Sequence, residues 1–170
     1  MNKIYILGSV ASGKTTLAKN LSIKTNIKYY ELDNVIFDDT KKINKKRSIE
    51  EQEKMIKKIN QEDSWIIEGT YRKSCHLVLD LAEYIIWLDP PIVLRKIRIL
   101  TRFVKQKLHM EKCNYQVNYS MLKAMYKWTK EFEQDRGNLE KMLNNYEDKL
   151  IFIKNSKEIK DFLEKQQENK

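Results

Sequence analysis

The chain has 170 residues, of which 41% are hydrophobic, and it carries a formal net charge of +9 at pH 7. This length suits one domain, residues 1–170, that can bury a core without disulfides or metals to hold it. Because Asp80, Glu83 and Asp89 interrupt the most apolar region, no stretch is long enough to span a bilayer, and we expect no membrane anchor.

The first predicted element is a buried strand over residues 4–7, and a phosphate-binding loop follows it directly. Glycines let this loop bend close to phosphate, while its amides and the start of the next helix present partial positive charge. Because cleavage of a signal peptide would destroy the motif, we expect a cytoplasmic protein. The loop reads Gly8-Ser9-Val10-Ala11-Ser12-Gly13-Lys14-Thr15, the full G-x-x-x-x-G-K-T pattern.

This loop predicts a site for a nucleoside triphosphate with Mg²⁺. Lys14 is expected to contact the β- and γ-phosphates, Thr15 to place its hydroxyl on Mg²⁺, and Thr16 to contact the α-phosphate. The candidate residues for binding the cofactor, taken as ATP, are Gly8, Ser9, Ala11, Ser12, Gly13, Lys14, Thr15 and Thr16.

The rest of the chain alternates between predicted strands and helices. Five strands alternating with helices predict an α/β protein, with a three-layer α/β/α fold around a five-stranded parallel sheet and right-handed crossovers. Strands after the first are expected at residues 28–32, 65–67, 84–88 and 150–153. Helices are expected at residues 14–24, 48–61, 75–81, after Asp89, and at 156–166.

Three boundaries carry local signals. Ser48 and Glu51 have the spacing of a capping box, which predicts the start of a helix at this point. Asp89 is expected to cap the following helix, with prolines tolerated in its first turn. Residues 34–47 are polar and aperiodic and are expected to form a loop, so that about 34–62 makes a segment on the acceptor side.

Arginines gather on the helix after the strand at 84–88. At about 100° per residue, one side of this helix is apolar and is expected to pack, while another is cationic. Solvated cationic faces are common, but this helix leaves the carboxyl end of a strand, where open α/β sheets bind ligands, and guanidinium groups suit phosphate. The apolar side carries Val93, Ile97, Leu100, Val104 and Leu108, and the cationic side carries Arg95, Arg98, Arg102 and Lys105.

Two segments resemble adenylate kinases. Residues 65–72, Trp-Ile-Ile-Glu-Gly-Thr-Tyr-Arg, are similar to the signature of three apolar residues followed by D-G-F-P-R, with Thr70 and Tyr71 departing from it. The resemblance implies an adenylate or shikimate kinase-like P-loop fold. Glu68, Gly69 and Arg72 match the signature, and Asp89, Pro91, Leu94, Arg98 and Arg102 match the family's strand-end Asp, its Pro and its lid-helix pattern with two phosphate-contacting arginines.

A closer resemblance is to the small adenylate kinase-like proteins called DNA topology modulation proteins. The shared segments are Leu32-Asp33, W-I-I-[DE]-G-x-Y at 65–71, W-L-D at 87–89, and a late helix with Trp128 followed by Arg136. This resemblance implies ATP binding. We expect a lid-like helical segment at about 103–136, in which Arg136 closes over the donor together with Arg98 and Arg102.

The acceptor side offers acids and a cation. Asp33 is expected to orient or deprotonate an acceptor hydroxyl, although a turn or capping role stays open. Glu68 is expected to hold Mg²⁺ through water, with a helix cap as the alternative, and Arg72 to meet the acceptor. The catalytic candidates are Lys14, Asp33, Arg98, Arg102 and Arg136; the substrate-binding candidates are Asp33, Glu68, Gly69 and Arg72; and the metal candidates are Thr15 and Glu68.

Several other residues receive weaker interpretations. Asn155 and Ser156 follow the last strand, where relatives hold the adenine base through backbone groups. A base-stacking role for Trp128 stays open. His76 and His109 are expected at the surface without a carboxylate partner. Cys75 and Cys113 lack metal or disulfide spacing, which argues against a zinc-bearing lid.

These patterns predict an ATP-dependent kinase that transfers the γ-phosphate to a small molecule or nucleotide. AMP as the acceptor is doubtful because no recognisable AMP-binding arginine follows Asp33. Two alternatives stay open: a regulator that touches DNA and uses ATP as a switch, and a slow NTPase. The positive charge permits a nucleic-acid partner but does not favour one, because the lysines are scattered. Monomer and homodimer are equally open.

Overall fold

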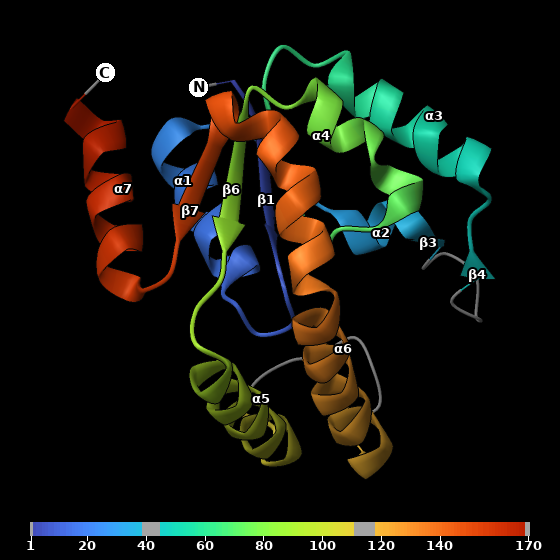
Figure 1. Cartoon of the computed structure of the whole chain (residues 1–170), viewed down its shortest axis with the longest axis vertical. Coiled ribbons are helices and arrows are strands. Elements are labelled where there is room, and N and C mark those ends of the chain that lie inside the picture. Colours follow the sequence, from blue (N-terminus) through green and yellow to red (C-terminus); the bar gives the residue numbers. More distant parts are fainter. Residues whose placement is uncertain (1, 39–44, 111–117, 169–170) are drawn as a thin grey trace.

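Five parallel strands form the central sheet, in the order β2-β5-β1-β6-β7. The computed structural model describes residues 2–38, 45–110 and 118–168. Strand β1 lies in the middle, so the loop that follows it opens at the carboxyl edge between β5 and β6. Figure 1 shows β1 beside β6. The expected parallel sheet is confirmed. Its strands are β1 (Lys3–Gly8), β2 (Tyr29–Glu31), β5 (Trp65–Gly69), β6 (Tyr84–Leu88) and β7 (Leu150–Ile153).

Helices cover both faces of this sheet, which gives the expected three layers. One face is covered by α1 (Lys14–Thr25) and α7 (Ser156–Glu168). Helix α5 (Ile92–Lys107) lies beyond the carboxyl edge, beside the first half of α6 (Figure 1). The other face is covered by α2 (Leu32–Ile36), α3 (Ile49–Asn60), α4 (Leu77–Leu81) and the second half of α6 (Tyr119–Leu143), with short 3-10 turns η1 (Lys73–Cys75) and η2 (Asn144–Lys149).

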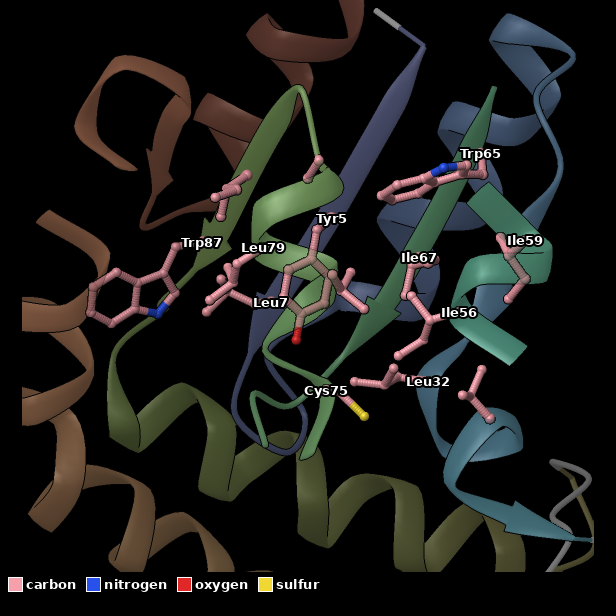
Figure 2. Close-up of a cluster of buried hydrophobic side chains, with 14 of the residues drawn as sticks. Tyr5, Leu7, Leu32, Ile56, Ile59, Trp65, Ile67, Cys75, Leu79 and Trp87 are labelled. Atoms are coloured by element: carbon pink, nitrogen blue, oxygen red, sulfur yellow. The ribbon is translucent and has the colours of Figure 1, made fainter. Parts of the chain in front are cut away.

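Alternation along the strands divides the core into two halves. Tyr5 and Leu7 of β1 face α3 and α4, whereas Ile4 and Ile6 face α1 and α7. Figure 2 shows the first half, in which Trp65 lies on the same side as Tyr5. Burying both faces of each strand explains the near-continuous apolar runs, as is usual for parallel sheets. None of the helices in the described ranges has the length and apolarity needed to cross a membrane.

The expected loop at residues 34–47 is partly wrong. Leu32 ends the second strand early and begins α2, and the two-residue strands β3 (Phe37–Asp38) and β4 (Lys45–Lys46) pair antiparallel. Arg47 stabilises this turn, because its guanidinium donates to the carbonyls of Asn34 at 2.7 Å and of Phe37, and pairs with Asp38 at 3.4 Å. Residues 39–44 of this segment lie outside the described residues.

The capping box at α3 is confirmed. The Ser48 hydroxyl accepts from the Glu51 amide at 3.2 Å, and the Ser48 amide donates to the Glu51 carboxylate at 2.8 Å. The expected cap at Asp89 is wrong: α5 begins at Ile92 behind Pro91 and has no side-chain cap. Asp89 is instead nearly buried and engages arginines, because its carboxylate is in reach of both α5 and α6.

The apolar side of α5 does not pack as predicted, whereas its arginine side faces the carboxyl edge of the sheet. Arg95 is only 1% exposed, and the buried apolar residue of the helix is Ile99. This happens because α5 does not lie flat on the sheet: its arginine side faces the phosphate loop at the carboxyl edge. The stripe expected to pack is 46–64% exposed and consists of Val93, Ile97, Leu100, Val104 and Leu108.

Candidate functional site

The loop after β1 has the backbone shape that its sequence predicts. A Cβ on Gly8 would lie 2.4 Å from the carbonyl oxygen of Leu88, so no larger residue fits there. Gly13 has a φ of 109°, in the left-handed region that favours glycine, and it directly precedes α1. Amides of the loop and of the first turn of α1 therefore lie at one place, as in sites that bind phosphate. Thr16 is exposed in that first turn.

Lys14 lies folded over the loop. Its Nζ donates to the carbonyl oxygen of Ser9 at 2.7 Å. Desolvation lowers the pKa of Lys14, and the charge of Arg102 lowers it further, while Glu68 and Asp33 act in the opposite direction. The ammonium therefore sits among several charges at the mouth of the loop, and an added phosphate would favour its protonated form.

The two candidate metal ligands are in direct contact. The Thr15 hydroxyl donates to Oε1 of Glu68 at 2.6 Å, although the two residues are 53 positions apart. Glu68 is only 6% exposed, and burial raises the pKa of its carboxyl despite the opposing effects of Lys14 and Thr15. A hydroxyl and a carboxylate are hard oxygen ligands that suit Mg²⁺.

This pair fits a metal that arrives with a nucleotide. In the described part of the chain, no group of three or more His, Cys, Asp or Glu side chains could hold a metal ion. Mg²⁺ in proteins commonly takes one or two protein oxygens and completes its shell with phosphate and water. Thr15 and Glu68 supply such a partial set.

The acceptor-side candidates also meet. Arg72, after β5, donates to the carboxylate of Asp33 in α2 at 3.0 Å, and its guanidinium lies over the Phe37 ring at 5.7 Å. Both side chains of the ion pair are well exposed. Gly69 has a steric role, because a Cβ there would lie 2.5 Å from the Cβ of Leu32. The end of β5 can therefore approach α2 closely, which brings Arg72 and Asp33 together.

Arginines of α5 reach the loop from the opposite side. Nη1 of Arg98 donates to the carbonyls of Ala11 at 3.3 Å and of Ser12 at 2.9 Å. Arg102 is exposed, and its charge is felt at Lys14. A pocket extends from this point toward the start of α7. It is lined by Ser12, Leu88, Pro90, Arg98, Ile153, Lys154, Asn155, Ser156 and Ile159, and so includes both residues expected near a base.

Arg136 engages Asp89 rather than the loop. Its Nη2 donates to Oδ2 of Asp89 at 2.7 Å, and its guanidinium lies over the Trp87 ring at 5.9 Å. Burial raises the pKa of the Asp89 carboxyl, while Arg136 and Arg95 counteract this effect. The expected role of Arg136 over the donor stays a prediction. Trp128 is 46% exposed on α6, and its stacking role also stays a prediction.

Sequence reasoning missed Arg95. It was placed on the cationic side of its helix without a role of its own, yet its Nη1 donates to the Ser9 hydroxyl at 2.6 Å and its Nη2 to the carboxylate of Glu133 on α6. The available signal was its position, one helical turn before Arg98 and therefore on the same side of α5.

His76 was expected to lack a carboxylate partner, which is wrong. Its Nε2 lies 4.0 Å from Asp80, and its two ring nitrogens lie 3.1 Å from the hydroxyls of Tyr71 and Tyr146. Burial and a 2.6 Å hydrogen bond to Asp80 raise the pKa of Tyr146 to about 12, so this hydroxyl stays protonated at neutral pH. Cys75 is free and buried, while Cys113 lies outside the described residues.

Two solved shikimate kinases share this architecture. Shikimate kinase from Bacteroides thetaiotaomicron has 13% identity over 98% of this chain and 96% of its own, with a TM-score of 0.53. A shikimate kinase from Acinetobacter baumannii, in complex with shikimate, has 13% identity over 97% and 90%, with a TM-score of 0.51. A sugar kinase from a Janibacter species has 19% identity over 76% and 78%, with a TM-score of 0.44.

The sequence itself matches no family model and no curated protein. The two shikimate kinases therefore establish the fold, which is a shikimate kinase-like P-loop α/β fold with a five-stranded parallel sheet. The expected place among DNA topology modulation proteins stays a prediction.

Proposed function

We propose that the protein is an ATP-dependent kinase that phosphorylates a hydroxyl group of a small polar molecule. The observation that carries this proposal is a juxtaposition at one sheet edge: the loop with Lys14 and the Thr15–Glu68 pair at its centre, and the Asp33–Arg72 pair beside it. Phosphoryl transfer requires positioning and charge neutralisation more than covalent chemistry, and these residues supply both.

On the donor side, loop amides and Lys14 would hold the β- and γ-phosphates. Thr15 and Glu68 would hold Mg²⁺, whose chemistry is to neutralise charge on the phosphate oxygens. Arg98 and Arg102 stand on α5 on the other side of the loop, where guanidinium groups suit the charge that develops during transfer. The base would lie near Asn155 and Ser156, which line the small pocket beside Arg98.

On the acceptor side, Asp33 would orient the attacking hydroxyl and accept its proton. Arg72 would bind an anionic or strongly polar group of the same molecule. Opposite charges on two adjacent, exposed side chains favour an acceptor that has both a hydroxyl and an acidic group. One structural neighbour of the same fold is a shikimate kinase in complex with shikimate, which supports a small polar acceptor.

The test compares wild type with Lys14→Ala for ATP consumption and product formation across nucleosides, nucleoside monophosphates and small hydroxy acids. Lys19→Ala is the matched control, because Lys19 is an exposed lysine on the same helix. We expect one acceptor class to yield a phosphorylated product with wild type and Lys19→Ala, and a loss of at least about a hundredfold in Lys14→Ala. Equal turnover by all three proteins would contradict the proposed site. ADP release without any phosphorylated product would instead identify an NTPase.

A further inference from the structure

We infer that Arg95 is a positioning residue for the phosphate loop. Arg95 fixes the hydroxyl of Ser9, and through Ser9 it fixes the bend of the loop whose carbonyl Lys14 contacts. This inference rests on the proposed function, since it concerns the loop that would hold the nucleotide. It assigns a task to a residue whose two terminal nitrogens are engaged by Ser9 and Glu133.

Four hydrogen bonds meet at Ser9. Its hydroxyl accepts a hydrogen bond from Nη1 of Arg95 at 2.6 Å and donates one to the carbonyl oxygen of Val10 at 3.3 Å. Its carbonyl accepts from Nζ of Lys14 at 2.7 Å and from the amide of Ser12 at 3.3 Å. A chain of hydrogen bonds therefore leads from Arg95 through one residue to the lysine and to the backbone of the loop.

Arg95 is itself held from the other side. Its Nη2 pairs with Glu133 on α6 and lies 3.8 Å from Asp89 at the end of β6, and its guanidinium lies over the Phe132 ring at 5.7 Å. With 1% exposure, the guanidinium has a fixed geometry. The acids alone would compensate its charge, so the contact with a neutral loop hydroxyl is not needed for neutralisation.

An arginine is suited to this task, and a lysine is not. The planar guanidinium directs two nitrogens to two partners at once, here Ser9 and Glu133, whereas an ammonium is a single point. Because Arg136 holds the other oxygen of Asp89, α6 is joined to the same network at a second place. The position of α6 is thereby coupled to the first bend of the loop.

The experiment is a double-mutant cycle on nucleotide affinity. Arg95→Lys, Ser9→Ala and the combined variant are compared with wild type by calorimetry with Mg²⁺ and a non-hydrolysable ATP analogue, and the thermal midpoint of each is measured without ligand. Lys96→Arg, at an exposed neighbour on α5, is the control, because like the tested variants it leaves the net charge unchanged. We expect each single variant to bind about tenfold more weakly, because a hydrogen bond with a charged donor is lost.

The combined variant should bind the ATP analogue no more than about tenfold more weakly than wild type, because both single changes remove the same hydrogen bond. Ser9→Ala leaves a buried guanidinium N–H without its partner and should lower the thermal midpoint somewhat. Its affinity loss should nevertheless persist at temperatures at which every variant is fully folded, which a purely structural role for Arg95 does not explain. Affinities within twofold of wild type for Ser9→Ala, or losses that add in the combined variant, would overturn the inference while leaving the proposed function intact. Absence of nucleotide binding by wild type would overturn both.

Discussion

Glu68 is the residue at which stability and function oppose each other most directly. Its carboxylate is nearly buried at the end of β5, and burial raises its pKa although Lys14 and the Thr15 hydroxyl favour the charged form. A buried charge without full compensation costs stability. The proposed function needs this charge, because it would hold Mg²⁺ together with Thr15. The buried charge therefore costs the free protein stability, and bound Mg²⁺ would offset this cost.

Glu68→Gln should stabilise the protein and abolish Mg²⁺-dependent nucleotide binding. The amide keeps an oxygen for Thr15 but removes the charge, so we expect a gain of about 1 kcal/mol in the free energy of unfolding at pH 7. Because the folded pKa is raised, wild-type stability falls as pH rises from the ordinary carboxyl value through the raised one. The gain in the free energy of unfolding of Glu68→Gln should therefore vanish at pH values below that range. Denaturant titrations test this, with the exposed Glu140→Gln as control; a loss of stability at pH 7 would contradict it.

Lys14 should take up protons when nucleotide binds at alkaline pH. Its pKa in the folded protein is lowered, chiefly by desolvation. Over a range of pH, part of the folded molecules therefore carry a neutral Lys14, while Lys14 of the unfolded chain is still charged. The free energy of unfolding rises with pH through that range. A bound triphosphate raises the pKa again.

Calorimetry at pH 9 in two buffers of different ionisation enthalpy measures this uptake. The binding heat of wild type should depend on the buffer, and that of Lys14→Arg should not, because guanidinium stays protonated. Equal heats in both buffers for wild type would contradict the lowered pKa.

At the scale of single residues, the sequence predicted the residues that belong to local motifs. The loop residues follow from a contiguous motif, and the structure places Thr15 beside Glu68 and Arg72 beside Asp33. Arg95 was not predictable in the same way. Helical periodicity separates its side from the apolar stripe, but only tertiary packing of α5 against the loop and α6 decides which side is buried.

At the scale of elements, α5 is where the sequence and the structure differ most. The sequence predicted an apolar side that packs, but the structure buries Arg95 together with Ile99 and leaves the apolar stripe exposed. Amphipathic periodicity predicts that a helix has an apolar and a polar side, but it does not predict which element each side packs against. Here the neighbour is the phosphate loop and not the sheet.

A matched pair of truncations tests this orientation. Ile99→Ala removes a side chain that is 1% exposed and should cost about 3 kcal/mol in the free energy of unfolding. Leu100→Ala, its half-exposed neighbour, should change the free energy by less than about 0.5 kcal/mol. Urea unfolding measures both. A larger loss for Leu100→Ala than for Ile99→Ala would show that the stripe is packed after all.

The segment after β2 shows a second limit of sequence patterns. Residues 34–47 lack a period of their own, and the order they have comes from Arg47, whose guanidinium satisfies carbonyls ten to thirteen positions earlier. Such a long-range contact has no local signature. The capping box of α3, by contrast, is a four-residue motif and was predicted with its residues.

For the whole molecule, alternation of strands and helices was sufficient to predict the parallel sheet and its layers. The strand order was not predictable from periodicity alone, because β2 pairs with β5 and β6 with β7 across long crossovers. That order creates the site, since it sets the ends of β1, β2 and β5 side by side. The catalytic hypothesis therefore depends on topology as much as on motifs.

The most direct test of this account is calorimetric titration of the wild-type protein with ATP in the presence and absence of Mg²⁺. We expect saturable binding at one site per chain that is tighter with Mg²⁺ and is lost in Lys14→Ala. No heat of binding with wild type, or unchanged affinity in Lys14→Ala, would contradict the assignment of the loop after β1 as the nucleotide site.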